Sequence, residues 1–286
     1  MSVEHQPLES NALTLAVQKG LDEIQDIYDS QPENESTNMF CLGGVGAGKS
    51  KLIETLRMPA LVHSFDPGGT KTIRHIIRKA DNPKGTVLAD TRFERENALK
   101  PSAYALWESE MTKLTRSGIF ANIGTYVIDS STNWAASALN KIIADRGMIG
   151  KMQIPWGIYQ ILLTTLINEM TLMMALPCDV YITGHLTYEK DDLLGKTIAR
   201  PLIPGQSRER MPIVFDEVWV LNVKATPSGN TRQILTQNDG YFECATRLKD
   251  LKKWEEPDVK AMLRKGGVRN TDMPMPWLET GGTVGP

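Results

Sequence analysis

A glycine-rich octapeptide constrains the fold of this chain more than any other feature of its sequence. It comprises Gly43, Gly44, Val45, Gly46, Ala47, Gly48, Lys49 and Ser50. Glycines allow a backbone to wrap a chain of phosphates so that successive N–H groups point inward. An apolar run, 38–42, precedes the octapeptide, and a helix is predicted from Gly48 to about Arg57. The octapeptide therefore predicts a phosphate-binding loop between a strand and the positive end of a helix.

The octapeptide ends in two side chains that suit a nucleoside triphosphate. Lys49 supplies a cation for the β- and γ-phosphates, and the Ser50 hydroxyl completes the shell of a Mg²⁺ ion. Such a site needs a further acidic group for the metal, and Asp129 ends the apolar run T-Y-V-I-D. The alternative is that Asp129 is only the polar residue at a strand end and has no role at the metal. We expect ATP and Mg²⁺ as the ligands.

The rest of the chain predicts an α/β fold, because apolar runs alternate with amphipathic segments. The predicted strands cover residues 38–42, 61–65, 86–91, 126–129 and 180–185, and the predicted helices cover 11–29, 70–80, 102–116, 133–145, 157–176 and 258–265. A β-hairpin is predicted from 217–226 and 231–237. Residues 186–212 are rich in Gly, Pro and charge, and they predict a long loop.

Three parts are expected along the chain: an acidic helix with a linker (1–37), a core (38–250), and a short helix with a tail (251–286). Residues 1–40 carry eight acidic side chains against one basic, and the remainder has a net charge of +5. A mildly basic body fits a polyanionic partner, and it equally fits an ordinary enzyme with an acidic tail.

Cysteine usage and hydropathy favour a cytoplasmic protein. The three cysteines, Cys41, Cys178 and Cys244, are far apart and lack metal-ligand spacing, which suggests reduced thiols. The most apolar stretch, 158–176, contains Gln160 and is better interpreted as a buried helix than as a membrane span. No membrane partner is expected.

Several motifs resemble those of RecA-like P-loop ATPases. Aspartate followed by serine at 129–130 is one, and the order of the parts is another: glycine loop, Asp66 turn, Asp129 strand, two helices and a strand with a polar end. The segments G-H-L-T-Y-E-K, F-D-E-V and A-T-R are similar to those of compact phage members that act in single-strand annealing and recombination. The resemblance covers about residues 38–250. It implies a mostly parallel sheet flanked by helices, with a C-terminal β-hairpin.

The resemblance also implies roles for residues outside the loop. His185 would sense the γ-phosphate, with a surface histidine as the alternative. The glutamate that usually orients the attacking water is replaced by Gly68, so Asp66 is the first candidate and Glu94 or Glu96 the next. Arg247 would act on the nucleotide of a neighbouring subunit in a homo-oligomer, although Ala245 stands where a lysine is usual.

Two loops, 147–156 and 186–212, match those that contact single-stranded DNA in RecA-like recombinases. Their candidate contacts are Lys151, Trp156, Lys190, Lys196, Arg200, Arg208 and Arg210. Cations can follow phosphates and aromatic rings can stack on bases. A solvated loop is the alternative, because acidic residues are interspersed.

The leading hypothesis is an ATPase that acts on single-stranded DNA in phage recombination, annealing or replication, in the host cytoplasm. One alternative is a non-catalytic assembly module gated by nucleotide, which the glycine at position 68 favours. A kinase for small molecules or nucleotides is the other, and the arginines of 200–210 would then form its lid.

Overall fold

The structure, a computed structural model, describes residues 10–31, 35–78, 81, 86–191, 195–227 and 229–275. The strands are β1 (Asn38–Gly43), β2 (Ala60–Ser64), β3 (Val87–Asp90), β4 (Thr125–Asp129), β5 (Asp179–Gly184), β6 (Leu186–Asp191), β7 (Lys196–Pro201), β8 (Glu217–Thr226), β9 (Gly229–Leu235) and β10 (Trp254–Glu255). The α-helices are α1 (Ser10–Asp29), α2 (Arg74–Ile77), α3 (Ala103–Ser117), α4 (Ser131–Asp145), α5 (Trp156–Met174), α6 (Ser207–Arg210) and α7 (Val259–Lys265).

An eight-stranded sheet forms the centre of the molecule, in the order β10-β9-β8-β1-β5-β4-β2-β3. All strands from β8 across to β3 run parallel, and β9 and β10 are antiparallel additions. β5, which leads into His185, lies between β1 and β4. The carboxyl ends of β1, β5 and β4 therefore meet at one edge. The predicted fold class, a mostly parallel sheet flanked by helices with a C-terminal β-hairpin, is confirmed.

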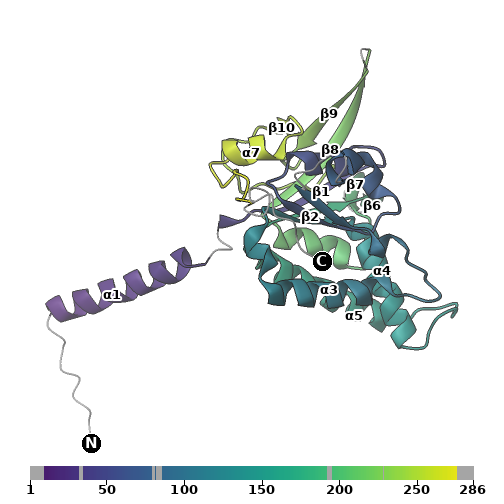
Figure 1. The fold of residues 1–286 in the computed structure, drawn as a ribbon, viewed down its shortest axis with the longest axis horizontal. Helices are drawn as coiled ribbons and strands as arrows, with labels where there is room; N and C mark the ends of the chain where they lie inside the picture. The colour runs from purple at the N-terminus through teal and green to yellow at the C-terminus, as the bar shows by residue number, and fades with distance from the viewer. Residues whose placement is uncertain are drawn as a thin grey trace, which may run out of the picture.

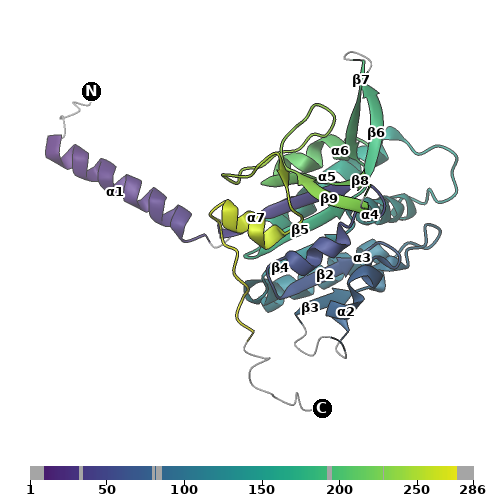
Figure 2. The same cartoon turned by 90° about the horizontal axis from the view of Figure 1, so that it is seen from above.

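Helices cover both faces of the sheet (Figures 1 and 2). One face packs against α3, α4 and α5, and the other against α7 and a 3₁₀ helix, Ser50–Thr55. Successive side chains of a strand point to opposite faces. In β1, Phe40 accordingly lies in the first core and Cys41 in the second, and both are fully buried. A strand that is buried on both faces appears in the sequence as an unbroken apolar run.

Two predicted helices are shorter than the sequence suggested. After the glycine loop, the 3₁₀ helix Ser50–Thr55 replaces the helix predicted to reach Arg57. Leu56 is extended and fully buried, and Pro59 prevents a helix from continuing past it. The helix predicted at 70–80 is a 3₁₀ turn, Gly69–Ile73, followed by the single turn of α2. Residues 79–80 lie outside the described ranges.

The long loop predicted at 186–212 is wrong. β6 and β7 form an antiparallel ribbon, in which Glu189 faces Ile198, and α6 follows it. Ile198 and Ala199 are buried, and Ala199 also bridges to Phe242. One pair of charged residues meets across the ribbon, Arg200 with Glu189 at 3.7 Å. The many charged residues obscured the alternation of apolar and polar residues that indicates strands.

The two ends of the chain differ in how they meet the core. α1 projects away from the sheet (Figure 1), and apolar side chains such as Leu21 and Ile24 are more than half exposed. Residues 251–265 instead pack on the core. β10 pairs with β9, and Val259 and Leu263 of α7 are fully buried. No helix within the described ranges is both long and apolar enough to cross a bilayer.

His63, on β2, gives the core a pH dependence. Its side chain is buried, and its Nδ1 lies 2.9 Å from the hydroxyl oxygen of Tyr126. Burial lowers the pKa of His63 to about 4, whereas an unfolded histidine titrates near ~6.5. Between these pH values the unfolded chain binds more protons than the folded chain. The stability that depends on neutral His63 is therefore present above pH ~6.5 and is lost as the pH falls towards 4.

We expect acidification from about pH 7 to about pH 5 to lower the free energy of unfolding by roughly 2 kcal/mol through His63. Urea titrations at the two pH values measure this change. His63→Gln is the control, because its amide can still bond the Tyr126 hydroxyl but does not titrate. The same acid loss in this variant would assign the effect to other groups.

Candidate nucleotide-binding site

The glycine loop leaves the carboxyl end of β1 in a conformation that only glycine adopts easily. Gly46 has a φ of 75° and Gly48 a φ of 107°, in the region that disfavours residues with a Cβ. The Ala47 N–H donates to the Gly44 carbonyl at 3.2 Å, which closes the turn. The loop then enters the 3₁₀ helix at Ser50, so the N–H groups at the start of this helix face the same space.

Lys49 reaches back over this loop. Its side chain is mostly buried, and Nζ donates to the carbonyls of Gly43 at 2.9 Å and Gly44 at 3.0 Å. Nζ also lies 3.5 Å from Nδ1 of His185. Burial lowers the pKa of Lys49. A desolvated ammonium beside inward-facing N–H groups provides a strong site for an anion such as a phosphate.

Asp129 lies beside the loop, at the end of β4. The Ser50 hydroxyl donates to Asp129 Oδ2 at 2.7 Å, and the Thr183 hydroxyl donates to Oδ1. Asp129 is 1 % exposed, and burial raises its pKa. Burial disfavours the charged form of Asp129, and a nearby dication would stabilise that carboxylate.

These oxygen donors match the preference of Mg²⁺. Among the described residues, no group of three or more His, Cys, Asp or Glu side chains is arranged to hold a metal ion. A magnesium ion here would depend on Ser50, on the neighbourhood of Asp129 and on phosphate oxygens together. That is the situation expected where a metal binds with its nucleotide.

Asp66 and His185 face each other across the site. His185 Nε2 lies 3.2 Å from Asp66 Oδ2. Asp66 Oδ1 accepts from the Ser130 hydroxyl at 2.5 Å and from the Asn133 amide at 2.7 Å. Burial by itself would raise the pKa of Asp66, but the bonds from His185, Ser130 and Asn133 outweigh it and hold the pKa below its usual value. Asp66 is therefore a carboxylate at neutral pH, and His185 connects it to Lys49.

Glu94 supports the turn that follows Asp66. Its carboxylate accepts from the Ser64 hydroxyl at 2.8 Å and from the Gly68 N–H at 2.9 Å. Gly68 has a φ of 72°, so a glutamate at this position would be strained. The structure thus gives a backbone reason for the glycine at position 68. Asp66 is among the residues that line the cavity described next, and Glu94 is not.

A cavity of about 500 Å³ lies over the loop, between the loop and the turn after β2. Its lining includes Gly48, Lys49, Ser50, Asp66, His185 and Arg232. The volume falls within the ~300–1,000 Å³ range of small-molecule sites. The structure therefore brings together the predicted loop, Asp66 and His185 around one space, with Asp129 next to it.

Arg232, on β9, is one of the lining residues that the sequence did not indicate. Its Nε donates to the Ala47 carbonyl at 2.9 Å. A Cβ at Gly48 would lie only 3.2 Å from the same nitrogen, so the guanidinium rests directly on the loop. Arg232 faces Val223 across the β8–β9 pair. Only the register of this pair could have revealed the contact.

Arg247 lies away from this cavity. Arg247 comes after β9 in the chain and lies at the amino end of β8. Its Nη1 is 2.7 Å from Asp216 Oδ1. Asp216 in turn bonds the first residue of β1, whereas the loop begins at the other end of that strand. The Arg247 side chain is 69 % exposed. Arg247 is therefore outside the cavity of its own chain.

The candidate DNA contacts divide into paired and unpaired cations. Arg200 is within 3.7 Å of Glu189, Glu209 and Glu243, and Arg208 pairs with Glu189. Among the described residues, no ion pair involves Lys151, Lys190, Lys196 or Arg210. Trp156 begins α5 and is 68 % exposed. The structure thus leaves four cations and one ring available.

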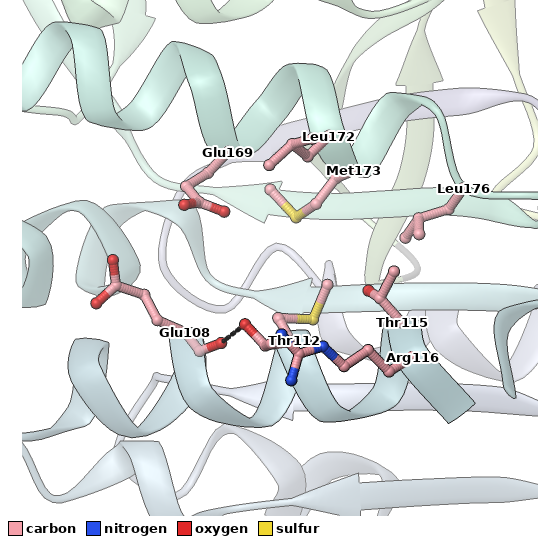
Figure 3. Close-up of a pocket in the computed structure, with 9 residues that line it drawn as sticks. Glu108, Thr112, Thr115, Arg116, Glu169, Leu172, Met173 and Leu176 are labelled. Carbon is pink, nitrogen blue, oxygen red and sulfur yellow. Dashed lines mark hydrogen bonds between the residues drawn. The ribbon is translucent and has the colours of Figure 1, made fainter. Parts of the chain in front are cut away.

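A separate cavity of about 420 Å³ lies between α3 and α5. Figure 3 shows Glu108 and Arg116 on one helix facing Glu169 and Met173 on the other. Burial raises the pKa of both glutamates. The cavity extends to Leu176, just before β5 begins, which is the opposite edge of the sheet from the glycine loop. It takes no part in the candidate nucleotide site.

Comparisons with solved structures find distant likenesses. A KaiC-like protein from the archaeon Pyrococcus horikoshii OT3 is 12% identical, with 70% of this chain and 78% of that chain covered and a TM-score of 0.40. A prototypical ATPase from the type III secretion system of pathogenic bacteria is 16% identical, with 65% and 51% covered and a TM-score of 0.42.

A third structure is the assembled ATPase EscN, in complex with its central stalk EscO, from the type III secretion system of enteropathogenic E. coli. It is 13% identical, with 75% of this chain and 47% of that chain covered and a TM-score of 0.43. This chain thus spans about half the length of the two secretion ATPases. These likenesses are too distant to transfer an activity.

No curated protein matches this chain. The family described as AAA domain matches residues 35–248, which include the glycine loop, every parallel strand of the sheet and the β8–β9 hairpin. This match covers most of the chain, and the chain belongs to the AAA domain family.

Proposed function

We propose that this chain binds ATP with Mg²⁺ and hydrolyses it, and that it couples turnover to single-stranded DNA. The bond from Ser50 to Asp129, 2.7 Å long and next to the Lys49 loop, is the observation that carries the ATP part. It joins a phosphate loop to a buried acid through a metal-binding hydroxyl. When bound, Mg²⁺ would neutralise charge on the phosphate oxygens. Ser50 would be its protein ligand, with Asp129 holding its water shell.

In the proposed reaction, a water oxygen attacks the γ-phosphorus and the bond between that phosphorus and the β,γ-bridging oxygen breaks. ADP and phosphate leave, and the proton of the water passes to phosphate or solvent. Asp66 is ionised and can accept a hydrogen bond from the water. Lys49 would move from the Gly43 and Gly44 carbonyls to the phosphates. His185 lies within hydrogen-bonding distance of both Lys49 and Asp66 and would respond to the γ-phosphate.

Asp66→Asn tests this assignment. We expect ATP binding within about threefold of wild type and hydrolysis at least about 100-fold slower, since general-base assistance contributes roughly 10²–10⁴-fold. Single-turnover hydrolysis and nucleotide titration measure the two quantities. Glu94→Gln is the matched control, with an expected rate loss below about tenfold. A larger loss in Glu94→Gln than in Asp66→Asn would exchange the two roles.

The DNA part of the proposal rests on the surface near α5 and the β6–β7 ribbon. A cavity of about 570 Å³ is lined there by Trp156, Tyr159 and Arg208. Tyr188 of β6 is 55 % exposed and stacks on Tyr241 at 5.9 Å between ring centroids. Exposed rings suit unstacked bases. Lys190 and Lys196, on the two strands of the ribbon, form no ion pair among the described residues and suit the phosphates.

The ribbon is also connected to the nucleotide site. His185 immediately precedes β6, and its carbonyl accepts from the Leu202 N–H at 2.8 Å, at the end of β7. A movement of His185 towards a phosphate would therefore pull on both strands at the base of the ribbon. We propose that this connection couples nucleotide state to DNA binding. A role in phage recombination or annealing follows from the family resemblance of these motifs.

Hydrolysis with and without single-stranded DNA tests the coupling. We expect DNA to raise the turnover rate about tenfold. We also expect Trp156→Ala to weaken DNA binding by about tenfold, because base stacking contributes roughly 1–3 kcal/mol. Trp156→Phe should retain most of the affinity. If DNA neither stimulates turnover nor binds, a nucleotide-gated assembly module becomes the better proposal.

We propose a homo-oligomer as the working form. Arg247 is exposed and lies at the opposite sheet edge from its own loop, so a nucleotide that it contacts must belong to a neighbour. Its Asp216 partner would have to be exchanged for phosphate at that interface. The rival interpretation as a kinase is weakened because Arg200 is held by three carboxylates and does not line the nucleotide cavity.

A further inference from the structure

The cavity between α3 and α5 has charged groups that the candidate nucleotide site does not use. Its volume of about 420 Å³ falls within the ~300–1,000 Å³ range of small-molecule sites. Glu108 and Arg116 line it from α3, and Glu169 lines it from α5 (Figure 3). Charges of both signs on one cavity wall indicate a ligand that is itself charged.

Two carboxylates gather at one end of this cavity. Burial raises the pKa of Glu108 and of Glu169, and the charge of Glu108 raises the pKa of Glu169 further. Lys141 of α4 lies 3.9 Å from Glu108, but it also bonds Asp145 at 2.9 Å. Glu169 has no ion-pair partner among the residues that the structure describes. A cation placed between the two carboxylates would stabilise both.

A buried hydroxyl adds a third oxygen near these carboxylates. Tyr104 lies one helical turn before Glu108 on α3, so the two side chains share a face of the helix. Tyr104 is 2 % exposed, and its hydroxyl has no hydrogen-bond partner among the described residues. Burial raises the pKa of Tyr104, and the charges of Glu169 and Glu108 raise it further, as expected of a hydroxyl that lies near both. A donor on a ligand would satisfy this oxygen.

Arg116 supplies the opposite charge farther along the cavity. It follows Glu108 by eight positions on the same helix, which is a rise of about 12 Å. Figure 3 shows the Arg116 side chain extended back along the cavity towards Thr112, as is usual for long side chains on a helix. Arg116 is exposed and forms no ion pair within the described part of the chain. It can therefore bind an anion.

The cavity wall between the charges is apolar. Met111 stands between Glu108 and Arg116 in the sequence of α3, and Leu172 and Met173 contribute from α5. Such a wall suits an alkyl chain. No group of three or more His, Cys, Asp or Glu side chains among the described residues is arranged for a metal ion, so an ammonium group suits the carboxylate end better than a metal does.

We propose that the cavity between α3 and α5 binds an alkyl zwitterion, whose ammonium lies between Glu108 and Glu169 and whose carboxylate pairs with Arg116. The ω-amino acids and the C-terminal lysine of a polypeptide share this chemistry. The cavity extends to Leu176 at the sheet edge opposite the glycine loop. The inference is therefore independent of ATP binding and goes beyond the proposed function.

NMR titration of the full chain with three six-carbon ligands tests the proposal. ε-Aminocaproate carries both charges, hexylamine only the amine and hexanoate only the carboxylate. We expect ε-aminocaproate to bind wild type with a Kd of about 1 mM or lower. Each singly charged ligand should bind at least about tenfold more weakly, because it lacks one charge-assisted contact. Equal affinity for the three ligands, or no binding of ε-aminocaproate at about 10 mM, would overturn the proposal.

Two variants assign the two ends of the cavity. Glu169→Gln should weaken ε-aminocaproate about tenfold and leave hexanoate within about twofold of wild type. Arg116→Gln should also weaken ε-aminocaproate about tenfold, but it should leave hexylamine within about twofold. Lys113→Gln, on the same helix and outside the cavity lining, is the matched control and should leave all affinities unchanged. Equal losses of ε-aminocaproate and the singly charged ligand in either variant would contradict the assignment.

Nα-acetyl-lysine and its amide distinguish the two sources of this chemistry. If the acid binds like ε-aminocaproate and the amide at least about tenfold more weakly, the cavity accepts the C-terminal lysine of a polypeptide. If neither binds while ε-aminocaproate does, a free ω-amino acid is the ligand. Equal binding of the acid and the amide would overturn the role of Arg116.

Discussion

Lys49→Ala is expected to abolish ATP turnover, with a loss of at least about 100-fold in kcat/KM. The Lys49 ammonium is the cation that the structure places over the glycine loop, and no other lysine bonds the loop carbonyls of Gly43 and Gly44 within the described residues. It would stabilise charge that builds on the γ-phosphate oxygens during transfer. Steady-state phosphate release measures the loss.

The fold should survive this substitution. Lys49 is a mostly buried cation whose pKa is lowered by desolvation, so its removal relieves the free-energy cost of burying a charge. Thermal unfolding of Lys49→Ala should stay within a few degrees of wild type. Lys113→Ala, an exposed lysine of α3 that pairs with Glu110 at 3.5 Å, is the control for turnover. Wild-type hydrolysis by Lys49→Ala would refute the site.

Arg57→Ala is expected to lower the free energy of unfolding by about 3–5 kcal/mol. Arg57 and Asp179 form a buried ion pair, with Nη1 2.9 Å from Oδ1 and both side chains 1 % exposed. Asp179 Oδ1 also accepts from the Thr37 N–H, whereas Oδ2 has no hydrogen-bond partner among the described residues. Burial raises the pKa of Asp179 to about 6 even beside Arg57. Without Arg57 an unpaired acid would remain in the core.

Urea denaturation measures this loss, and a double variant tests its cause. Arg57→Met with Asp179→Leu removes both charges, so it should recover at least about half of the stability lost in Arg57→Ala. Lys141→Ala removes a partly exposed pair with Asp145 and should cost less than about 1 kcal/mol. A double variant as unstable as Arg57→Ala would mean that packing of the guanidinium, and not the ion pair, stabilises the fold.

The parts of the site that the sequence predicted are those that depend on local structure. A glycine loop must follow β1, and Asp129 and His185 follow or end apolar runs. Parallel strands bring such ends to one edge, so these residues meet whatever the details of packing. The same local logic placed the β8–β9 hairpin within a few residues of its observed bounds.

Charged residues obscured the strand pattern of the β6–β7 ribbon in the sequence. The β6–β7 ribbon looked like a loop because its strands are interrupted by charged residues, and those residues pair only once the ribbon has formed. Glu94, a candidate for orienting the attacking water, bonds the Ser64–Gly68 turn, and Asp66 lines the cavity. Which acid faced the cavity depended on how that turn folds.

Sequence alone determined the loop, the parallel sheet and the edge at which its acidic and histidine side chains gather, since each follows from spacing within one segment. Tertiary structure alone decided the contacts between segments. Arg232 meets Ala47 across 185 positions and Arg57 meets Asp179 across 122. Such contacts depend on strand register and on which polar groups are buried together, and neither is encoded in the spacing of a single segment.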